Sequence, residues 1–330
     1  MVPARTCCEP RCEDGVVVTV FVIAGGLSHE RDVSLRSGAR VAQVLRERGL
    51  AVEVVDVNHE LAGRLQGDDD PVVVPVVHGG LGEDGALREV LELWGVPFVG
   101  ACGAASRRTF DKSIATRLVA GGGVATPQQV ALPDDIFKEL GAQAIMAALG
   151  ERLGFPLMVK PARSGSALGA VKVNAAEELP QALVGAFAYG KMAVVEEFID
   201  GVELAVTVID GGSGPRALPP VEIRPSGGVY DYEARYTAGA TRFVTPGELP
   251  EEVLGQAEAV AVRAHELLGL RDISRTDVIV RDGVVHFIEG NVAPGLTETS
   301  LVPLALEAAG LSLGEVVEDL IIRARTRSAE

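Results

Sequence analysis

Three oxygen-bearing side chains fall on two predicted strands joined by a short turn in the C-terminal third of the chain. Asp277 lies on the first strand, and Glu289 and Asn291 lie two residues apart on the second. Because side chains alternate along a strand, Glu289 and Asn291 share one face, and a turn at residues 281–283 brings Asp277 level with them. Carboxylate and amide oxygens suit Mg²⁺, which usually adds water and substrate phosphates to its shell. The alternative is a hairpin with a solvated polar face.

The segment that follows, residues 290–301, favours the metal site. It contains a Pro294-Gly295 turn directly after the oxygen donors and ends before a predicted helix. Irregular backbone of this kind presents N–H groups that can form an oxyanion hole.

A second candidate is the loop at residues 161–169, which is rich in small residues and follows Lys160 at the end of a predicted strand. The chain has only five lysines, so each one merits inspection. Small residues let the backbone approach phosphate oxygens while a lysine supplies charge. The pattern is not that of a P-loop, because Lys160 precedes the glycines and no G-K-[ST] is present. The alternative is a flexible hairpin loop with an exposed lysine.

The acidic segment at residues 196–203 links two predicted lobes. Backbone between strands can hydrogen-bond an adenine edge, and Glu203, seven residues after Glu196, could hold ribose hydroxyls. A solvated acidic linker would explain the same residues.

Two polar turns, residues 25–32 and 78–85, each follow a strand of one predicted sheet. Open α/β sheets bind ligands at the carboxyl ends of their strands, so both turns should face one crevice. The first turn does not match G-x-G-x-x-G, which argues against a dinucleotide site.

The elements that must position these residues begin with strands alternating with helices. Apolar strands at residues 16–24, 51–57 and 72–77 are separated by helical patterns, which predicts a parallel sheet covered on both faces. A helix containing Lys112 ends at three glycines. Further strands are predicted at residues 157–160, 171–173, 194–196, 204–209, 277–280 and 284–289, and further helices at about 175–188, 302–309 and 313–325.

This pattern divides the chain into a disordered tail and three lobes. The tail covers residues 1–15, a Rossmann-like α/β lobe covers 16–105, and two α+β lobes cover 106–202 and 203–330. Residues 227–239 are bounded by glycines and include Tyr230, Tyr232 and Tyr236. We interpret them as a lid that keeps water from a reactive intermediate.

Composition excludes several classes of protein. Of 330 residues, 47% are hydrophobic, yet no apolar run reaches the 18 or so residues of a membrane span. The net charge of -16 argues against a nucleic-acid partner. Cys7, Cys8 and Cys12 match no zinc spacing, and no secretory signal precedes the first strand, so we expect a cytoplasmic protein with reduced thiols.

The motifs together resemble those of the D-alanine-D-alanine ligase family of the ATP-grasp superfamily. In order they read G-G-x-S-x-E-R-x-V-S, H-G-x-x-G-E-D-G, D-K, V-K-P-x-R-x-G-S, E-x-F-x-x-G-x-E, Y-D-Y-E-A-R-Y, R-x-D and E-x-N-x-x-P-G-x-T-x-x-S-L. The resemblance covers residues 18–325. It implies an ATP-grasp fold in which the two later lobes enclose ATP.

The resemblance also implies roles for individual residues. Those implied to bind ATP are Lys112, Lys160, Glu196, Glu197, Phe198 and Glu203, and those implied to bind two Mg²⁺ (or Mn²⁺) ions are Asp277, Glu289 and Asn291. Those implied to act on the first amino acid and the oxyanion are Glu30, His78, Ser166, Tyr236, Arg275 and Gly295. Those implied to bind the second amino acid are Ser300, Leu301 and Arg235.

The implied activity is formation of D-alanyl-D-alanine from D-alanine and ATP through an acyl phosphate, for peptidoglycan precursor synthesis, and a homodimer is expected from the resemblance alone. The family usually has lysine where this chain has Arg235, and often a second serine where it has Ala167. Arginine and lysine differ around a phosphate, so the substrate pair is less secure than the reaction. The alternatives are a ligase of other amino acids or dipeptides, and a binding module that has lost catalysis.

Overall fold

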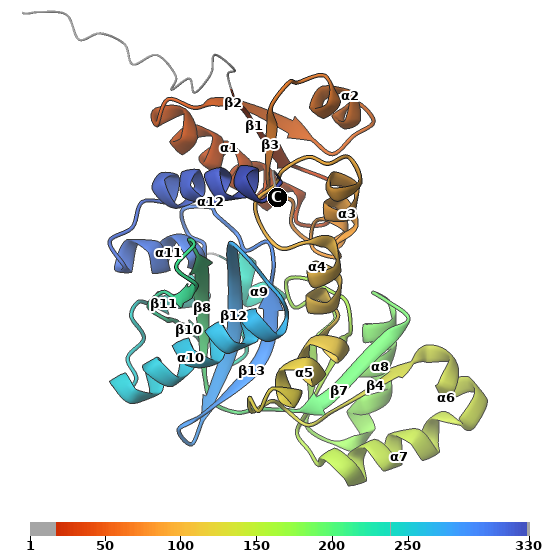
Figure 1. Ribbon diagram of the computed structural model, residues 1–330. Coiled ribbons are helices and arrows are strands. Elements are labelled where there is room, and N and C mark those ends of the chain that lie inside the picture. Colours follow the sequence, from red (N-terminus) through yellow and green to blue (C-terminus); the bar gives the residue numbers. More distant parts are fainter. Residues whose placement is uncertain (1–17, 238, 329–330) are drawn as a thin grey trace, which may run out of the picture.

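A computed structural model describes residues 18–237 and 239–328, whose elements form three sheets with helices packed against them (Figure 1). The predicted tail and Cys7, Cys8 and Cys12 lie outside the described residues. Within the described residues, no helix combines the length and apolar character that a membrane crossing requires.

The N-terminal sheet is parallel, as predicted, with the strand order β2-β1-β3. Its elements are β1 (Thr19–Ala24), α1 (Arg31–Glu47), β2 (Ala51–Asp56), α2 (Leu61–Gln66), β3 (Pro71–Pro75), a 3-10 turn (Gly80–Gly82) and α3 (Ala86–Leu93). Alternate residues of β1 face opposite sides, so Val20 and Val22 pack with α1, while Phe21 and Ile23 pack with α2 and α3. Both faces of the sheet are therefore buried.

A four-stranded antiparallel sheet follows two connecting helices and has the order β4-β7-β5-β6. Its elements and connectors are α4 (Gly103–Phe110), α5 (Lys112–Gly121), β4 (Gln129–Pro133), α6 (Asp134–Leu140), α7 (Ala142–Leu153), β5 (Leu157–Pro161), β6 (Val171–Val173), a 3-10 turn (Ala176–Glu178), α8 (Leu179–Phe187) and β7 (Met192–Glu197). The helix predicted from about residue 175 begins only at Leu179, because Pro180 fits the first turn of a helix but not its interior.

The C-terminal sheet has the order β11-β10-β8-β12-β13, and β9 pairs with β8. Its elements are β8 (Val202–Asp210), β9 (Pro215–Ala217), β10 (Val221–Pro225), α9 (Tyr232–Tyr236), β11 (Thr241–Val244), α10 (Glu251–Leu267), β12 (Ile273–Arg281), β13 (Val284–Asn291), α11 (Leu301–Ala308) and α12 (Leu313–Ser328). Val206 and Val208 of β8 pack against α10, which the sequence analysis does not predict.

Helix α12 joins the first and last sheets. Its apolar side chains, including Val316, Leu320 and Ile321, share one core with α1 and with β1 and β3 of the N-terminal sheet. In Figure 1 this helix lies between α1 and the C-terminal sheet. The arrangement brings the carboxyl ends of β1 and β3 towards β12 and β13. The division of the chain at residues 105 and 202 stays a prediction.

Candidate active site

A cavity of about 620 Å³ lies where the three sheets meet. It collects side chains from segments that are far apart in the sequence. The predicted site residues that line it are Glu30, His78, Lys112, Ser166, Arg235, Arg275, Glu289, Asn291, Gly295, Ser300 and Leu301. Those that do not line it are Lys160, Glu196, Glu197, Phe198, Glu203 and Asp277, and the side chain of Tyr236 lies outside the described residues.

The β12–β13 hairpin contains a one-residue shift in register between Asp277 and Val278. Asp277 pairs with Glu289 across the two strands, and Arg275 pairs with Asn291. The turn is formed by Asp282 and Gly283 with φ of 53° and 76°, as a tight hairpin turn requires. Two of the three oxygen donors therefore face each other, and Asn291 lies two residues farther along β13.

Arg275 holds Asp277 through a two-point ion pair. Its Nε lies 2.6 Å from Oδ1 of Asp277, and its Nη2 lies 2.8 Å from Oδ2. Burial opposes the charge of Arg275, but the charges of Asp277 and Glu289 more than offset it and raise the pKa of the guanidinium. Arg275 is thus a fixed cation in the cavity wall.

Glu289 is a partly buried carboxylate, 23% exposed, and is kept ionised by cations around it. Burial tends to raise its pKa, but Lys112, Arg235 and Lys160 lower it to about 2. The Nζ of Lys112 lies 3.2 Å from the Glu289 carboxylate and 2.7 Å from the carbonyl oxygen of Ser164. Lys112 therefore connects the oxygen donors with the predicted phosphate loop.

The Glu30 carboxylate crosses from the N-terminal sheet to that loop. Glu30 immediately precedes the first residue of α1, and its carboxylate accepts a hydrogen bond from the Ser166 hydroxyl. A Cβ at Gly79, whose φ is +64°, would overlap the Glu30 carboxylate, so glycine is required there. Burial, followed by the charge of Glu83, raises the pKa of Glu30.

His78 is tied to the loop after β13. Its Nδ1 donates to the carbonyl oxygen of Ala293 at 2.8 Å, and its Nε2 accepts from the Ser37 hydroxyl at 3.1 Å. Ser37 in turn accepts from the Leu296 N–H at 3.2 Å. Because burial lowers the pKa of His78, its ring is neutral and orients the loop that contains Gly295.

The start of α11 differs in part from the prediction. The Ser300 N–H, expected to bind a substrate carboxylate, donates to the carbonyl oxygen of Thr297 at 3.0 Å. The Ser300 hydroxyl accepts from the Thr297 N–H at 3.1 Å. A Cβ at Gly295 would lie 2.8 Å from that hydroxyl, which explains the need for glycine. The tight turn before the helix therefore uses the Ser300 N–H.

Lys160 and Glu196 form a buried ion pair on adjacent strands. Their charged atoms lie 2.5 Å apart, and their side chains are 7% and 5% exposed. In the β5–β7 ladder Lys160 faces Val194 and Met158 faces Glu196, so the two charges are diagonal neighbours on one face. The sequence analysis assigns them to different parts of ATP, whereas the structure pairs them.

The predicted adenine segment uses much of its backbone within the protein. The N–H of Glu197 donates to the carbonyl oxygen of Gln128 at 2.9 Å, and that of Phe198 donates to Pro156 at 3.1 Å. These two N–H groups are therefore not free for a base edge. Glu203 lies near the start of β8. Its pKa is raised to about 7, first by burial and then by the acidic residues beside it.

The predicted lid contains helix α9, which borders the cavity. Asp231 caps this helix by accepting from the Ala234 N–H at 2.9 Å. The guanidinium of Arg235 lies 4.3 Å from the centre of the Tyr230 ring, and that ring packs edge-on against Phe243. The Arg235 Nε is buried with no hydrogen-bond partner among the described residues.

The comparisons with known proteins show the family of this chain. A family model described as the D-alanine-D-alanine ligase C-terminus matches residues 118–322. A D-alanine-D-alanine ligase from Syntrophotalea carbinolica is 37% identical over 308 residues, which is 93% of this chain and 96% of that protein. This chain belongs to the D-alanine-D-alanine ligase family.

Solved structures of the family share its fold. The VanG D-Ala:D-Ser ligase from Enterococcus faecalis matches with a TM-score of 0.81 and 27% identity, over 93% of this chain and 99% of that one. The D-alanine-D-alanine ligase from Bacillus anthracis, complexed with ATP, matches with a TM-score of 0.77 and 27% identity, over 94% of this chain and 97% of that one. The predicted ATP-grasp fold is confirmed.

Two buried charged residues near the cavity were not assigned roles from sequence. Glu83 is buried, accepts from the Gly79 N–H at 3.0 Å and has a pKa raised by burial. Arg88 is fully buried and donates to the carbonyl oxygens of Gly82 and Val292, which links α3 to the end of β13. Glu83 belongs to the quoted H-G-x-x-G-E-D-G motif, which is a usable signal. Arg88 has no such signal, because a charged residue on a short helix is normally exposed.

Proposed function

We propose that this protein joins two D-alanine molecules in a reaction that converts ATP to ADP and phosphate. The observation that supports this most is the meeting of Glu30 and Ser166 with Arg275, Glu289 and Asn291 around one cavity, in a chain of this family. This arrangement supports Glu30 as the carboxylate that binds the amine, beside cations and oxygen donors suited to a triphosphate.

The reaction proceeds in two steps. The carboxylate oxygen of the first D-alanine takes the γ-phosphoryl group from ATP, which forms an acyl phosphate and releases ADP. The neutral amine of the second D-alanine then attacks the acyl carbon, phosphate leaves, and the amine proton passes to solvent or phosphate. Catalysis consists mainly of positioning and charge neutralisation.

The protein's own residues supply the positioning in the first step. Glu30 binds the ammonium of the first D-alanine, and Ser166 holds the Glu30 carboxylate in place. Arg275 and the Gly295 N–H stabilise negative charge on the reacting carboxylate. Lys112 contacts the phosphates, consistent with its place between Glu289 and Ser164.

Other residues complete the two substrate sites. Lys160 also contacts the phosphates, while the segment from Glu196 to Phe198 and Glu203 hold the nucleoside. The second carboxylate is bound at the start of α11 by Leu301 and, after the turn at Ser300 opens, by the Ser300 N–H. Arg235 faces the cavity from the lid and complements the phosphate and this carboxylate. Tyr236 closes the lid over Glu30 and Ser166.

The donor set fits two Mg²⁺ ions. Asp277 and Glu289 are neighbouring carboxylates, and Asn291 adds an amide oxygen two residues along β13 from Glu289. The described residues contain no cluster of three His, Cys, Asp or Glu side chains suited to a metal, but Mg²⁺ with ATP commonly uses one or two carboxylates and completes its shell with phosphates and water. When bound, the ions neutralise the charge of the triphosphate. A homodimer and a cytoplasmic location are part of this proposal.

A coupled assay of ADP release tests the function. We expect release with D-alanine that depends on Mg²⁺ and yields the dipeptide. The panel includes other D- and L-amino acids and D-lactate, because Arg235 in place of the family's lysine favours a shifted second-substrate pocket as the alternative. Faster turnover with another pair would establish that alternative. ATP binding without turnover on any pair would instead indicate a binding module.

A further inference from the structure

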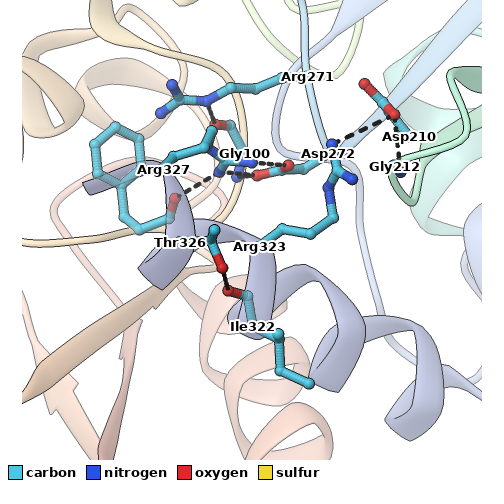
Figure 2. Close-up of polar contacts among 10 residues, drawn as sticks. Gly100, Asp210, Gly212, Arg271, Asp272, Ile322, Arg323, Thr326 and Arg327 are labelled. Atoms are coloured by element: carbon cyan, nitrogen blue, oxygen red, sulfur yellow. Dashed lines mark hydrogen bonds and ion pairs between the residues drawn. The ribbon is translucent and has the colours of Figure 1, made fainter. Parts of the chain in front are cut away.

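A polar cluster outside the cavity joins the N-terminal sheet to the C-terminal sheet, and we call it the Asp272 clamp. It consists of Asp272, Arg271, Arg327 and the Gly100 peptide (Figure 2). Asp272 is fully buried, and its two carboxylate oxygens accept from Arg327 at 2.6 and 2.7 Å. The Gly100 N–H donates to the same carboxylate at 2.7 Å. The fully buried carboxylate is therefore paired with a guanidinium that is 28% exposed.

The Gly100 peptide is held from both sides by consecutive residues. Its N–H donates to Asp272, and its carbonyl oxygen accepts from the Nε of Arg271 at 2.7 Å. The Arg271 guanidinium also lies 5.1 Å from the centre of the Phe98 ring. Phe98 bridges to Val73 of β3, so the clamp grips the chain where it leaves the N-terminal sheet.

The backbone of Asp272 is in a conformation that favours glycine. Its φ is +64°, and the other described non-glycine residues with positive φ are Ser166 and Ala167 of the phosphate loop and Asp282 of the hairpin turn. A side chain is unfavourable in this region, so an aspartate here indicates that the carboxylate has a use. The carbonyl oxygen of Asp272 also accepts from the Asp210 N–H at 2.7 Å, which fixes the peptide against β8.

The clamp connects the two halves of the active site without lining it. Asp272 immediately precedes β12, and the same strand carries Arg275 and Asp277. Gly100 follows the sheet whose strand ends carry Glu30 and His78. Arg327 comes from α12, whose apolar face packs in the core shared by the first and last sheets. A change at the clamp would therefore alter the position of one half relative to the other.

We propose that Asp272, with Arg327, is a positioning residue that sets Glu30 and His78 in register with Arg275 and Asp277. This inference rests on the ligase activity proposed above. Loosening the clamp moves the first amino acid relative to the γ-phosphate while nucleotide contacts persist. It also leaves the acyl phosphate less well shielded, so some of it is lost to water.

The test uses Asp272→Gly and Arg327→Lys in the full-length protein. Glycine suits the backbone at 272, so this variant should fold, and lysine keeps the charge at 327 but cannot make the two-point pair. The matched control is Arg323→Gln, on the same helix. Arg323 pairs with Asp210 at 3.6 Å, so its ion pair joins α12 only to the C-terminal sheet (Figure 2).

We expect kcat to fall about 10- to 100-fold in both clamp variants, which is the loss expected when the reacting groups are misplaced by about 1 Å. The KM for the first D-alanine should rise, the Kd for ATP should stay unchanged, and more than one ADP should be released per dipeptide. A merely structural role would reduce the folded fraction but would not change the ratio of ADP to dipeptide. Folded clamp variants that match Arg323→Gln in kcat and in that ratio would overturn the proposal.

Hydrogen exchange separates this proposal from the function on which it rests. If the wild-type protein does not turn over D-alanine, the proposed function fails, and the clamp is then judged by amide exchange in residues 98–103 and 273–277. We expect faster exchange in both segments of Asp272→Gly and not in Arg323→Gln. Unchanged exchange in Asp272→Gly would overturn the clamp in that case.

Discussion

Replacing Lys160 with methionine separates its role in stability from its role with ATP. The Lys160 and Glu196 side chains are almost fully buried and lie 2.5 Å apart. Removing the lysine leaves an unpaired carboxylate in the interior, which costs about 3–5 kcal/mol of unfolding free energy. We expect the melting temperature to fall by roughly 5–15 °C. Thermal unfolding followed by circular dichroism measures this.

The double variant Lys160→Met, Glu196→Leu provides the decisive comparison. Replacing both partners of a buried pair by apolar residues of similar volume is often neutral or stabilising. We therefore expect most of the lost stability to return. ATP affinity should not return, because the charged hydrogen bond from Lys160 to phosphate contributes about 1.5–3 kcal/mol, or roughly 10- to 150-fold in Kd.

Two results would refute this reasoning. If Lys160→Met melts at the wild-type temperature, the pair is not the buried contact that the structure shows. If the double variant regains wild-type ATP affinity, Lys160 has no direct role with the phosphates. Isothermal titration of ATP into each folded variant distinguishes these results.

Three further predictions concern the cavity. Glu289→Gln should abolish ADP release, because it removes charge from the proposed Mg²⁺ ligands; wild-type turnover would disprove the metal assignment. The Glu30 carboxyl must be ionised to bind an ammonium, and burial and Glu83 raise its pKa. As the pH is lowered, kcat/KM for D-alanine should therefore begin to fall at a higher pH than it would with an ordinary carboxyl group. A pH profile without this acidic limb argues against the role of Glu30. Gly79→Ala should raise the KM for the first D-alanine and leave ATP affinity unchanged, because the added Cβ would displace the Glu30 carboxylate; an unchanged KM would mean that Glu30 does not bind this substrate.

Local sequence patterns were enough to predict the parallel sheet and the oxygen donors. Valine-rich strands alternating with helices predicted the parallel sheet, because strand and helix periods are properties of neighbouring residues. Alternation and the turn at residues 281–283 likewise predicted that Asp277 lies level with Glu289 and Asn291, although the shift in register that sets Asp277 opposite Glu289 was not predicted. The motifs, taken in order, identified the family.

Only the tertiary structure decided which charged groups are buried together. Lys160 and Glu196 lie 36 positions apart, and Asp272 and Arg327 lie 55 apart, and no local period relates such residues. The Ser300 N–H also differs from the prediction, because the turn from Thr297 to Ser300 uses it internally. Burial and pairing depend on how distant elements pack, whereas the sequence by itself determined the elements and the residue types available to them.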